Sequence, residues 1–251
     1  MAERPFFLVR SLRAFRYPFR GLRVWGDRKL RPLAWPPVFF LLLALAGGTW
    51  GALRLFDVVS DAVWERPTGA WLVLWYPVQV LVAGSVALAA LFGVLVVQAI
   101  FTAPWNDALS ERVERLRTGK EGSPLTLGAV MDDVGRTIRI ELGKVGLYVA
   151  VMLPLFVLSW LVPVVGQAIF AVVGWVLTAL FLAFDYMDWP MARRGWGLGR
   201  RITFVRKDLW SAIGFGTGCW VMLFIPIVNV LFVPAAVTGG TTLLLDLERD
   251  A

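Results

Sequence analysis

The chain has 251 residues, of which 58% are hydrophobic, and it carries a formal net charge of +7 without a single histidine. Its mean hydropathy of +0.69 exceeds what a soluble domain of this length could reach, because such a domain could not bury so much apolar surface. The composition excludes a soluble protein and predicts a single membrane domain, residues 1–251, of the all-α integral membrane class.

Residues 1–31 form a basic amphipathic segment. Apolar residues recur at steps of three and four, and arginines follow the same rhythm on another face: Leu8, Leu12, Phe15, Phe19 and Leu22, with Arg13, Arg16, Arg20 and Arg23. This pattern is typical of a helix on a membrane surface, kinked here at Pro18. Attraction to anionic lipids explains the arginines, and we expect no nucleic-acid partner.

Two long transmembrane helices are predicted at residues 35–56 and 70–103, because about twenty apolar residues cross a ~30 Å hydrocarbon core. Small residues repeat every four positions in both: Gly47 and Gly51 in the first, and Ser85, Ala89 and Gly93 in the second. Such faces allow close helix approach. They predict either a packed antiparallel hairpin or contacts between subunits.

Residues 107–144 are predicted to form cytoplasmic helices. Asn106 and Asp107 are suitable caps for a short helix in which Glu111 and Arg115 have ion-pair spacing. A second helix is expected to begin near Ser123 and Pro124. A solvated surface is the ordinary explanation for such pairs.

Two further apolar ranges, 145–184 and 209–245, are interrupted by uncharged turns, LVPVVGQ and IPIVNVLFVP. The half-helix 210–224 would rise only ~22 Å, less than a bilayer core. We therefore predict two re-entrant, hemi-penetrating hairpins, with six full spans as the alternative. Gln167 and Asn229 are expected to satisfy the backbone groups freed at the turns or to contact an entering solute.

Charge predicts the orientation. The segment before the first span is rich in arginine, whereas the loop after it holds Asp57, Asp61 and Glu65 with Arg66. The basic loop 185–208 has the same character as the amino-terminal segment. The positive-inside rule therefore places the amino terminus in the cytoplasm.

Motifs for catalysis are sparse. RRGWGLGRR lacks the GxGxxG spacing, and Asp185 and Asp188 are better explained as partners of nearby arginines than as catalytic carboxylates. Cys219 is the only cysteine, so no zinc or redox cluster is available. We expect no enzyme activity, no metal and no cofactor.

Several segments together resemble the CysZ sulfate permeases and the related etoposide-induced membrane proteins. They are GLRVWGDRKLRPLAWPP, APWNDALSERVE, DYMDWP and GFGTGCWVMLFIPIVNVLFVPAAVTGGTTL, in the family's order. The resemblance implies a homo-oligomeric, multi-pass protein of the bacterial inner membrane that imports sulfate for cysteine biosynthesis. It also implies two long transmembrane helices and two hemi-penetrating hairpins.

The resemblance also implies an anion site just before the first span. The family's Gly-Leu-Arg type motif falls on Lys29, Leu30, Arg31 and Pro32, with lysine in place of glycine and proline in place of the second arginine. Arg31 keeps the family position, and Lys29 either assists it or anchors the span by snorkelling. A second GLR, at residues 21–23, lies earlier in the chain.

The expected function is passive, channel-like permeation of sulfate, since the apolar ranges have no ionisable residue at their centres for ion coupling. A permease for another oxyanion, such as thiosulfate or molybdate, and a non-transporting membrane scaffold of the same fold remain the alternatives.

Overall fold

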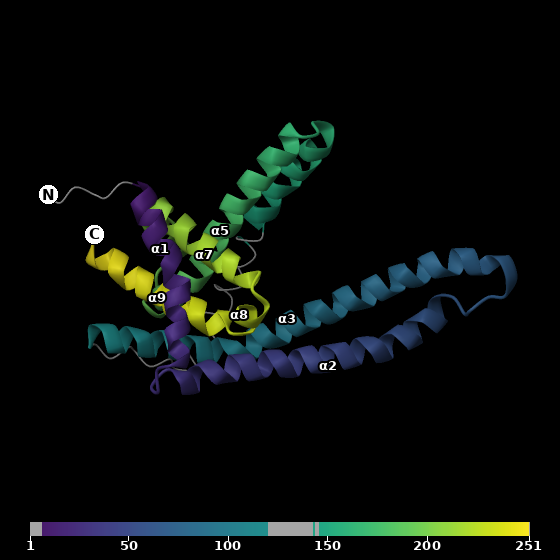
Figure 1. Ribbon diagram of the computed structural model, residues 1–251, viewed down its shortest axis with the longest axis horizontal. Coiled ribbons are helices and arrows are strands. Elements are labelled where there is room, and N and C mark those ends of the chain that lie inside the picture. The colour runs from purple at the N-terminus through teal and green to yellow at the C-terminus, as the bar shows by residue number, and fades with distance from the viewer. Residues whose placement is uncertain (1–6, 120–142, 144–145, 251) are drawn as a thin grey trace. The chain divides into compact units, whose positions relative to one another are not determined.

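The computed structural model describes residues 7–119, 143 and 146–250, and every regular element in these ranges is a helix (Figure 1). In chain order they are α1 (Phe7–Gly21), the 3-10 helix η1 (Leu22–Trp25), α2 (Arg31–Val63), η2 (Gly69–Trp71), α3 (Leu72–Thr118), a helix at Gly146–Leu161, α5 (Val165–Arg193), α6 (Leu198–Lys207), α7 (Leu209–Leu223), α8 (Pro226–Val230) and α9 (Phe232–Arg249). The helix expected near residues 123–144 lies outside the described residues, apart from Gly143.

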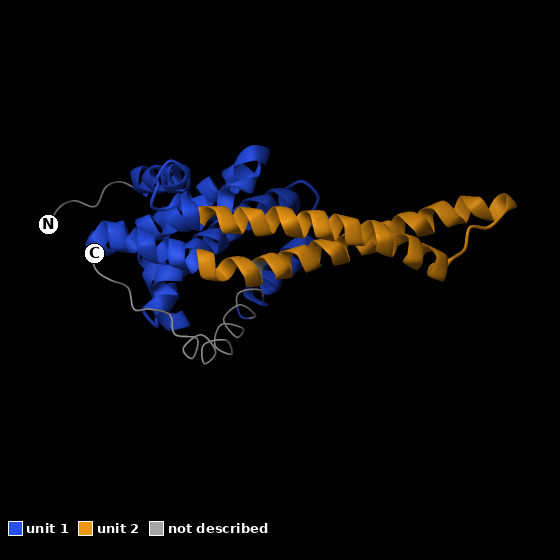
Figure 2. Cartoon of the chain, turned by 90° about the horizontal axis from the view of Figure 1, so that it is seen from below, with its two compact units in different colours: residues 1–33, 106–251 blue, residues 34–105 orange. Residues whose placement is uncertain are grey.

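Three of the described helical stretches are long and apolar enough to cross a membrane: Arg31–Val63, Gly69–Thr118 and Val165–Arg193. The chain is therefore an all-α, multi-pass membrane protein. Packing divides it into two compact units, residues 34–105 and residues 1–33 with 106–251 (Figure 2).

The unit 34–105 is a hairpin of α2 and α3. Phe40 stacks on Phe101 with ring centroids 5.4 Å apart, and the Trp75 indole donates a 3.1 Å hydrogen bond to the Trp64 carbonyl. The glycine that faces the partner helix is Gly48, where an added Cβ would lie 2.4 Å from Val94 Cγ2.

The small-residue faces predicted for this hairpin do not make its packing contacts. At Gly47, Gly51 and Gly93, no described atom beyond the local backbone of the same helix lies within 4 Å of an added Cβ, and Ser85 is exposed. The hairpin alternative was wrong for these faces, by one position in α2, because glycine spacing alone does not tell which side of a helix faces its neighbour; contacts between subunits remain the other alternative.

In the other unit, glycines in α7 bring three helices into backbone contact. A Cβ at Gly214 would lie 2.1 Å from the Ser11 carbonyl oxygen of α1, and one at Gly218 would lie 2.4 Å from that of Phe15. Gly216 faces the opposite way, and its Cβ would lie 1.7 Å from the Ala179 carbonyl oxygen of α5. The GFGTG motif therefore holds α7 between α1 and α5.

The amino-terminal helix α1 consequently packs with one of its faces against α7 and α9. Its buried residues are Ala14, Tyr17, Pro18 and Gly21, whereas Leu8 and Leu12 are 52% and 63% exposed. Within the apolar stripe predicted to face a membrane surface, Leu8 and Leu12 are thus open on the protein, whereas Phe19 and Leu22 pack against the core. Gly21 allows the closest approach to α9, since a Cβ there would lie 1.9 Å from the Ala235 carbonyl oxygen.

The range 145–184 contains a helical hairpin that turns at Val162–Val164. Phe156 and Phe170 pack edge to face, with ring centroids 6.0 Å apart. Gly166 is required at the turn, since a Cβ there would lie 2.6 Å from the Leu158 carbonyl oxygen. This range therefore forms a helical hairpin.

The basic loop expected at 185–208 is mostly helical. Helix α5 continues to Arg193, and α6 follows at Leu198–Lys207. The reason is packing, because a stripe with a four-residue step stays buried past the end of the apolar run: Ala179, Ala183, Met187 and Met191. With 29 residues, α5 is longer than the half-helix that we expected, whereas the 15 residues of α7 span only ~22 Å.

The short helix expected from residue 107 is the end of α3, which runs unbroken to Thr118. The Glu111 and Arg115 pair is confirmed at 2.9 Å. Asn106 and Asp107 are buried inside α3 and therefore cap no helix, and Asp107 accepts a charged hydrogen bond from Arg193 instead.

Candidate functional site

A pocket of about 420 Å³ lies in the unit that contains both ends of the chain. It is formed by the end of α1, η1 and the turn after it, the end of α3, and α9. Its lining residues are Tyr17, Arg20, Gly21, Arg23, Asp27, Leu30, Val113, Leu116, Arg117, Thr238, Gly239, Thr242 and Asp246. The volume is within the ~300–1,000 Å³ typical of small-ligand sites.

Three arginines supply the pocket with hydrogen-bond donors. Arg20 lies 5.6 Å from the centroid of the Tyr17 ring, and neither Arg20 nor Arg23 is paired with a carboxylate within the described part of the chain. Arg117 is paired, but loosely, with its Nη1 3.5 Å from Asp246 Oδ1. Guanidinium groups in this state favour an oxyanion, to which they can donate parallel hydrogen bonds.

Two carboxylates also line the pocket. Asp246 accepts a 2.6 Å hydrogen bond from the Tyr17 hydroxyl at Oδ2. Burial, the hydrogen bond to Asp246 and the charge of that carboxylate raise the pKa of Tyr17 to about 12. The hydroxyl therefore keeps its proton and donates at any pH used for transport assays. Asp27 has a local task, since its Oδ1 accepts 2.7 Å from the Lys29 backbone N–H in the turn before α2.

Hydroxyl groups complete the polar lining. Thr238 and Thr242 both line the pocket from α9. The Thr238 Oγ1 atom is buried and has no hydrogen-bond partner among the described residues. A buried hydroxyl without a partner is costly, so it is available to a ligand or to a water molecule that enters the pocket.

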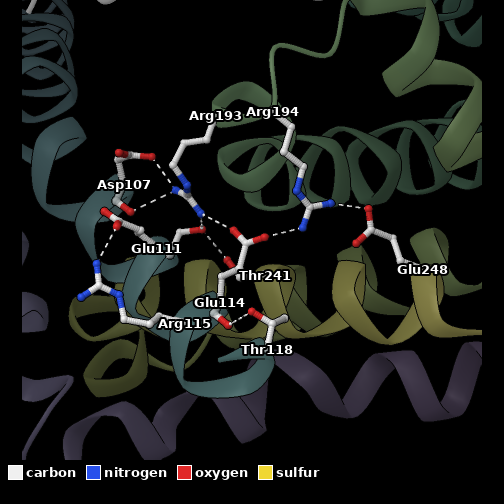
Figure 3. A network of polar contacts seen from close by, with 10 residues as sticks. Asp107, Glu111, Glu114, Arg115, Thr118, Arg193, Arg194, Thr241 and Glu248 are labelled. Atoms are coloured by element: carbon white, nitrogen blue, oxygen red, sulfur yellow. Dashed lines mark hydrogen bonds and ion pairs between the residues drawn. The ribbon is translucent and has the colours of Figure 1, made fainter. Parts of the chain in front are cut away.

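An ion-pair network next to the pocket fixes the end of α3 (Figure 3). Arg193, with a side chain only 6% exposed, donates to Asp107 Oδ1 at 2.5 Å and to Glu114 Oε2 at 3.1 Å. Arg194 bridges Glu114 of α3 and Glu248 of α9. The network joins three helices, each near its carboxyl-terminal end.

The carboxyl-terminal end of α3 both packs against α9 and lines the pocket. Ser110 Oγ lies 2.7 Å from Thr241 Oγ1, and both side chains are fully buried, so α3 is also tied to α9 by a hydroxyl pair. On the adjoining face of α3, Val113, Leu116 and Arg117 line the pocket. The network thus positions Arg117 relative to Asp246.

The predicted site residues fall in different places. Leu30 is buried and lines the pocket, whereas Lys29 and Arg31 flank it in the chain with exposed side chains. Gln167 and Asn229 are exposed on α5 and α8 and do not line the pocket. Figure 1 shows α8 well away from the tip where α5 begins.

Sequence reasoning missed most of the pocket. The GLR segment at residues 21–23 was the one sequence feature that indicated part of it, since Gly21 and Arg23 line the same pocket as Leu30. No sequence feature indicated Arg117 and Asp246, because they are 129 positions apart and only the folded chain brings them together.

Comparison with known proteins places this arrangement in a family. Residues 17–234 match the family described as Sulfate transporter CysZ/Etoposide-induced protein 2.4. Proteins named Sulfate transporter CysZ are similar over most of their length. The one from Pseudomonas fluorescens Pf0-1 is 31% identical over 223 residues, covering 88% of this chain and 85% of the relative. The one from Pseudomonas aeruginosa PAO1 is 32% identical over 227 residues, covering 90% and 91%. The resemblance inferred from the sequence is thereby confirmed, and the chain belongs to the Sulfate transporter CysZ/Etoposide-induced protein 2.4 family.

Proposed function

We propose that the protein is a sulfate permease that lets sulfate cross the bacterial inner membrane down its gradient. The observation that carries the proposal is the pocket in which Arg20 and Arg23 have no carboxylate partner among the described residues. The relatives named as sulfate transporters support the choice of anion. Supply of sulfur for cysteine biosynthesis is the physiological role that fits this activity.

The pocket suits a strongly hydrated dianion. Sulfate accepts hydrogen bonds and donates none, so it requires donors in place of its water shell. Arg20, Arg23 and Arg117 supply charged donors, and Thr238 supplies a neutral one. Lys29 and Arg31 add positive charge beside Leu30, where they attract the anion to the site.

A passive route fits the distribution of charge along the chain. Within the predicted spans 35–56 and 70–103, Arg54 is the only charged residue, and it lies near the end of its span. Proton- or sodium-coupled transporters use ionisable residues at membrane depth. Gln167, in the first turn of α5, and Asn229, in α8, are the uncharged amides that we propose to serve the backbone or a passing anion.

We also propose that the amino terminus is cytoplasmic, that anionic lipids surround the basic segments, and that the protein is a homo-oligomer. The abundance of arginine before α2 supports the orientation by the positive-inside rule. The open faces at Gly47, Gly51 and Gly93 leave room for another subunit in the membrane.

Purified protein in liposomes is expected to carry radiolabelled sulfate down its gradient without nucleotide. Arg23→Ala should weaken sulfate binding about ten- to a hundredfold, because loss of a charged hydrogen-bond donor costs ~1.5–3 kcal/mol. Arg31→Ala removes the charge beside Leu30 and should also weaken sulfate binding. Isothermal titration calorimetry measures the affinity. Arg206→Ala removes an exposed arginine from α6 and is the matched control.

The result decides between permease and scaffold. Folded parent protein that moves no more sulfate than empty liposomes would favour a non-transporting membrane scaffold. Faster flux of thiosulfate or molybdate than of sulfate would favour another oxyanion. If Arg23→Ala and Arg31→Ala both bind as the parent does, the anion site lies elsewhere, and the hairpin residues Gln167 and Asn229 become the place to test.

The proposal includes hairpins that enter the membrane part-way, and cysteine labelling tests it. In a Cys219→Ser background, cysteines at Val165 and Ile227 occupy positions that are 60% and 79% exposed in the protein, so only lipid would shield them. A membrane-impermeant maleimide added from the periplasmic side is expected to leave both unlabelled. Cysteine at Glu65, in the loop after α2, is the positive control. Rapid labelling of both hairpin positions would support full spans.

A further inference from the structure

One residue of the pocket has the wrong charge for an anion site. Asp246 lines the pocket, yet its carboxylate repels any anion that approaches Arg117. It is not a buried remnant of packing, because its side chain remains 20% exposed and it faces the cavity beside Arg117.

The contacts of Asp246 are unequal. The Tyr17 hydroxyl holds Oδ2 at 2.6 Å, which is a short, charge-assisted hydrogen bond. The pair with Arg117 is long at 3.5 Å, and the Arg117 side chain is 44% exposed. An ideal guanidinium–carboxylate pair is ~2.7–2.9 Å long. Asp246 is thus bound firmly by the Tyr17 hydroxyl and only weakly by Arg117, whose guanidinium group an anion would use.

This geometry produces competition. When the pocket is empty, Asp246 balances part of the positive charge of Arg117. An entering oxyanion takes over Arg117 while Tyr17 keeps the carboxylate close by, and the like charges then repel each other. A permeation pathway needs such a balance, since binding must be favourable enough for entry and weak enough for release.

We infer that Asp246 is the release residue of this pocket, a built-in carboxylate that competes with the bound oxyanion for Arg117 and so keeps binding weak and turnover fast. Tyr17 sets the strength of that competition by holding one carboxylate oxygen away from Arg117. The inference rests on the proposed function, because it assigns a step of sulfate transport to these residues.

The test compares sulfate affinity and sulfate flux in the same preparations. Asp246→Asn keeps the shape of the side chain and removes its charge. It is expected to bind sulfate about tenfold more tightly, equivalent to ~1.4 kcal/mol. Its flux at saturating sulfate should fall by a similar factor, because release becomes limiting. Asp250→Asn removes the same charge one helical turn away, at an exposed position outside the pocket, and should behave as the parent.

Tyr17→Phe is a second test variant, for which we expect the opposite change in sulfate affinity. It still tests the inference if Asp246→Asn does not fold. Without the hydroxyl, Asp246 is free to pair fully with Arg117, so sulfate should bind more weakly than to the parent. Unchanged or weaker affinity in a folded Asp246→Asn protein, or tighter affinity in Tyr17→Phe, would overturn the inference. A parent that neither binds nor carries sulfate would instead reject the proposed function.

Discussion

Gly216→Ala is expected to prevent the helices of the larger unit from packing. The added Cβ would lie 1.7 Å from the carbonyl oxygen of Ala179 and 2.4 Å from its carbonyl carbon. Both belong to the backbone of α5, so no side-chain rotation relieves the overlap, and α7 would have to move away from α5. We expect a loss of ~3 kcal/mol or more, at the upper end for overpacking.

Size-exclusion chromatography and thermal unfolding of the detergent-purified protein measure this effect. Gly93→Ala in α3 is the matched control, because no described atom beyond the local backbone of the same helix lies within 4 Å of its added Cβ. It should elute and melt as the parent does. A Gly216→Ala protein with the parent's melting temperature would mean that α5 and α7 are not in backbone contact.

The glycines also show which features of this fold could be predicted from the sequence. Apolar length identified the membrane class and the approximate position of α2 and α3, because crossing a bilayer sets a physical minimum. It did not identify the glycines that pack. Gly47 and Gly51 have the expected four-residue spacing and remain open, whereas Gly214, Gly216 and Gly218 alternate between two partner helices. Spacing gives a periodic face, but the partner that covers the face is decided by tertiary structure.

Predictions from local sequence patterns were wrong where a long-range contact stabilised a different structure. Asn106 and Asp107 have the right chemistry for a helix cap, yet a charged hydrogen bond from Arg193 to Asp107 replaces the cap. The apolar run ends at Phe184, yet α5 continues because Met187 and Met191 extend its buried stripe. At Asp107 a long-range contact outweighed a helix cap worth ~1 kcal/mol, and in α5 core packing outweighed the end of the apolar run.

The candidate site was predictable only in part. Resemblance led to Leu30, and the repeated GLR led close to Arg23, because both lie in one continuous stretch that joins α1 to α2. The opposing wall comes from α3 and α9. Nothing in the sequence marks Asp246 as a neighbour of Tyr17, since that hydrogen bond joins residues 229 positions apart.

Arg193→Ala is expected to destabilise the protein by ~3–5 kcal/mol, the usual cost of removing one partner from a buried ion pair. Arg193 donates to Asp107 Oδ1, to Ser110 Oγ and to Glu114 Oε2, and its own side chain is 6% exposed. Glu114 would keep Arg194, but Asp107 would be left as a buried charge without a cation. We expect a fall in melting temperature of about 10 °C, measured by tryptophan fluorescence.

Two further variants identify the cause of that loss and connect it to the pocket. Arg200→Ala removes an exposed arginine that lies 4.3 Å from the Trp196 ring centroid, and such a contact contributes only ~0.5–1 kcal/mol. Asp107→Asn in the Arg193→Ala background neutralises the orphaned carboxylate and should recover part of the melting temperature. Because the network positions Arg117, Arg193→Ala should also weaken sulfate binding, whereas Arg200→Ala should not. If Arg193→Ala melts like Arg200→Ala, the network does not hold the end of α3, and the position of Arg117 must have another cause.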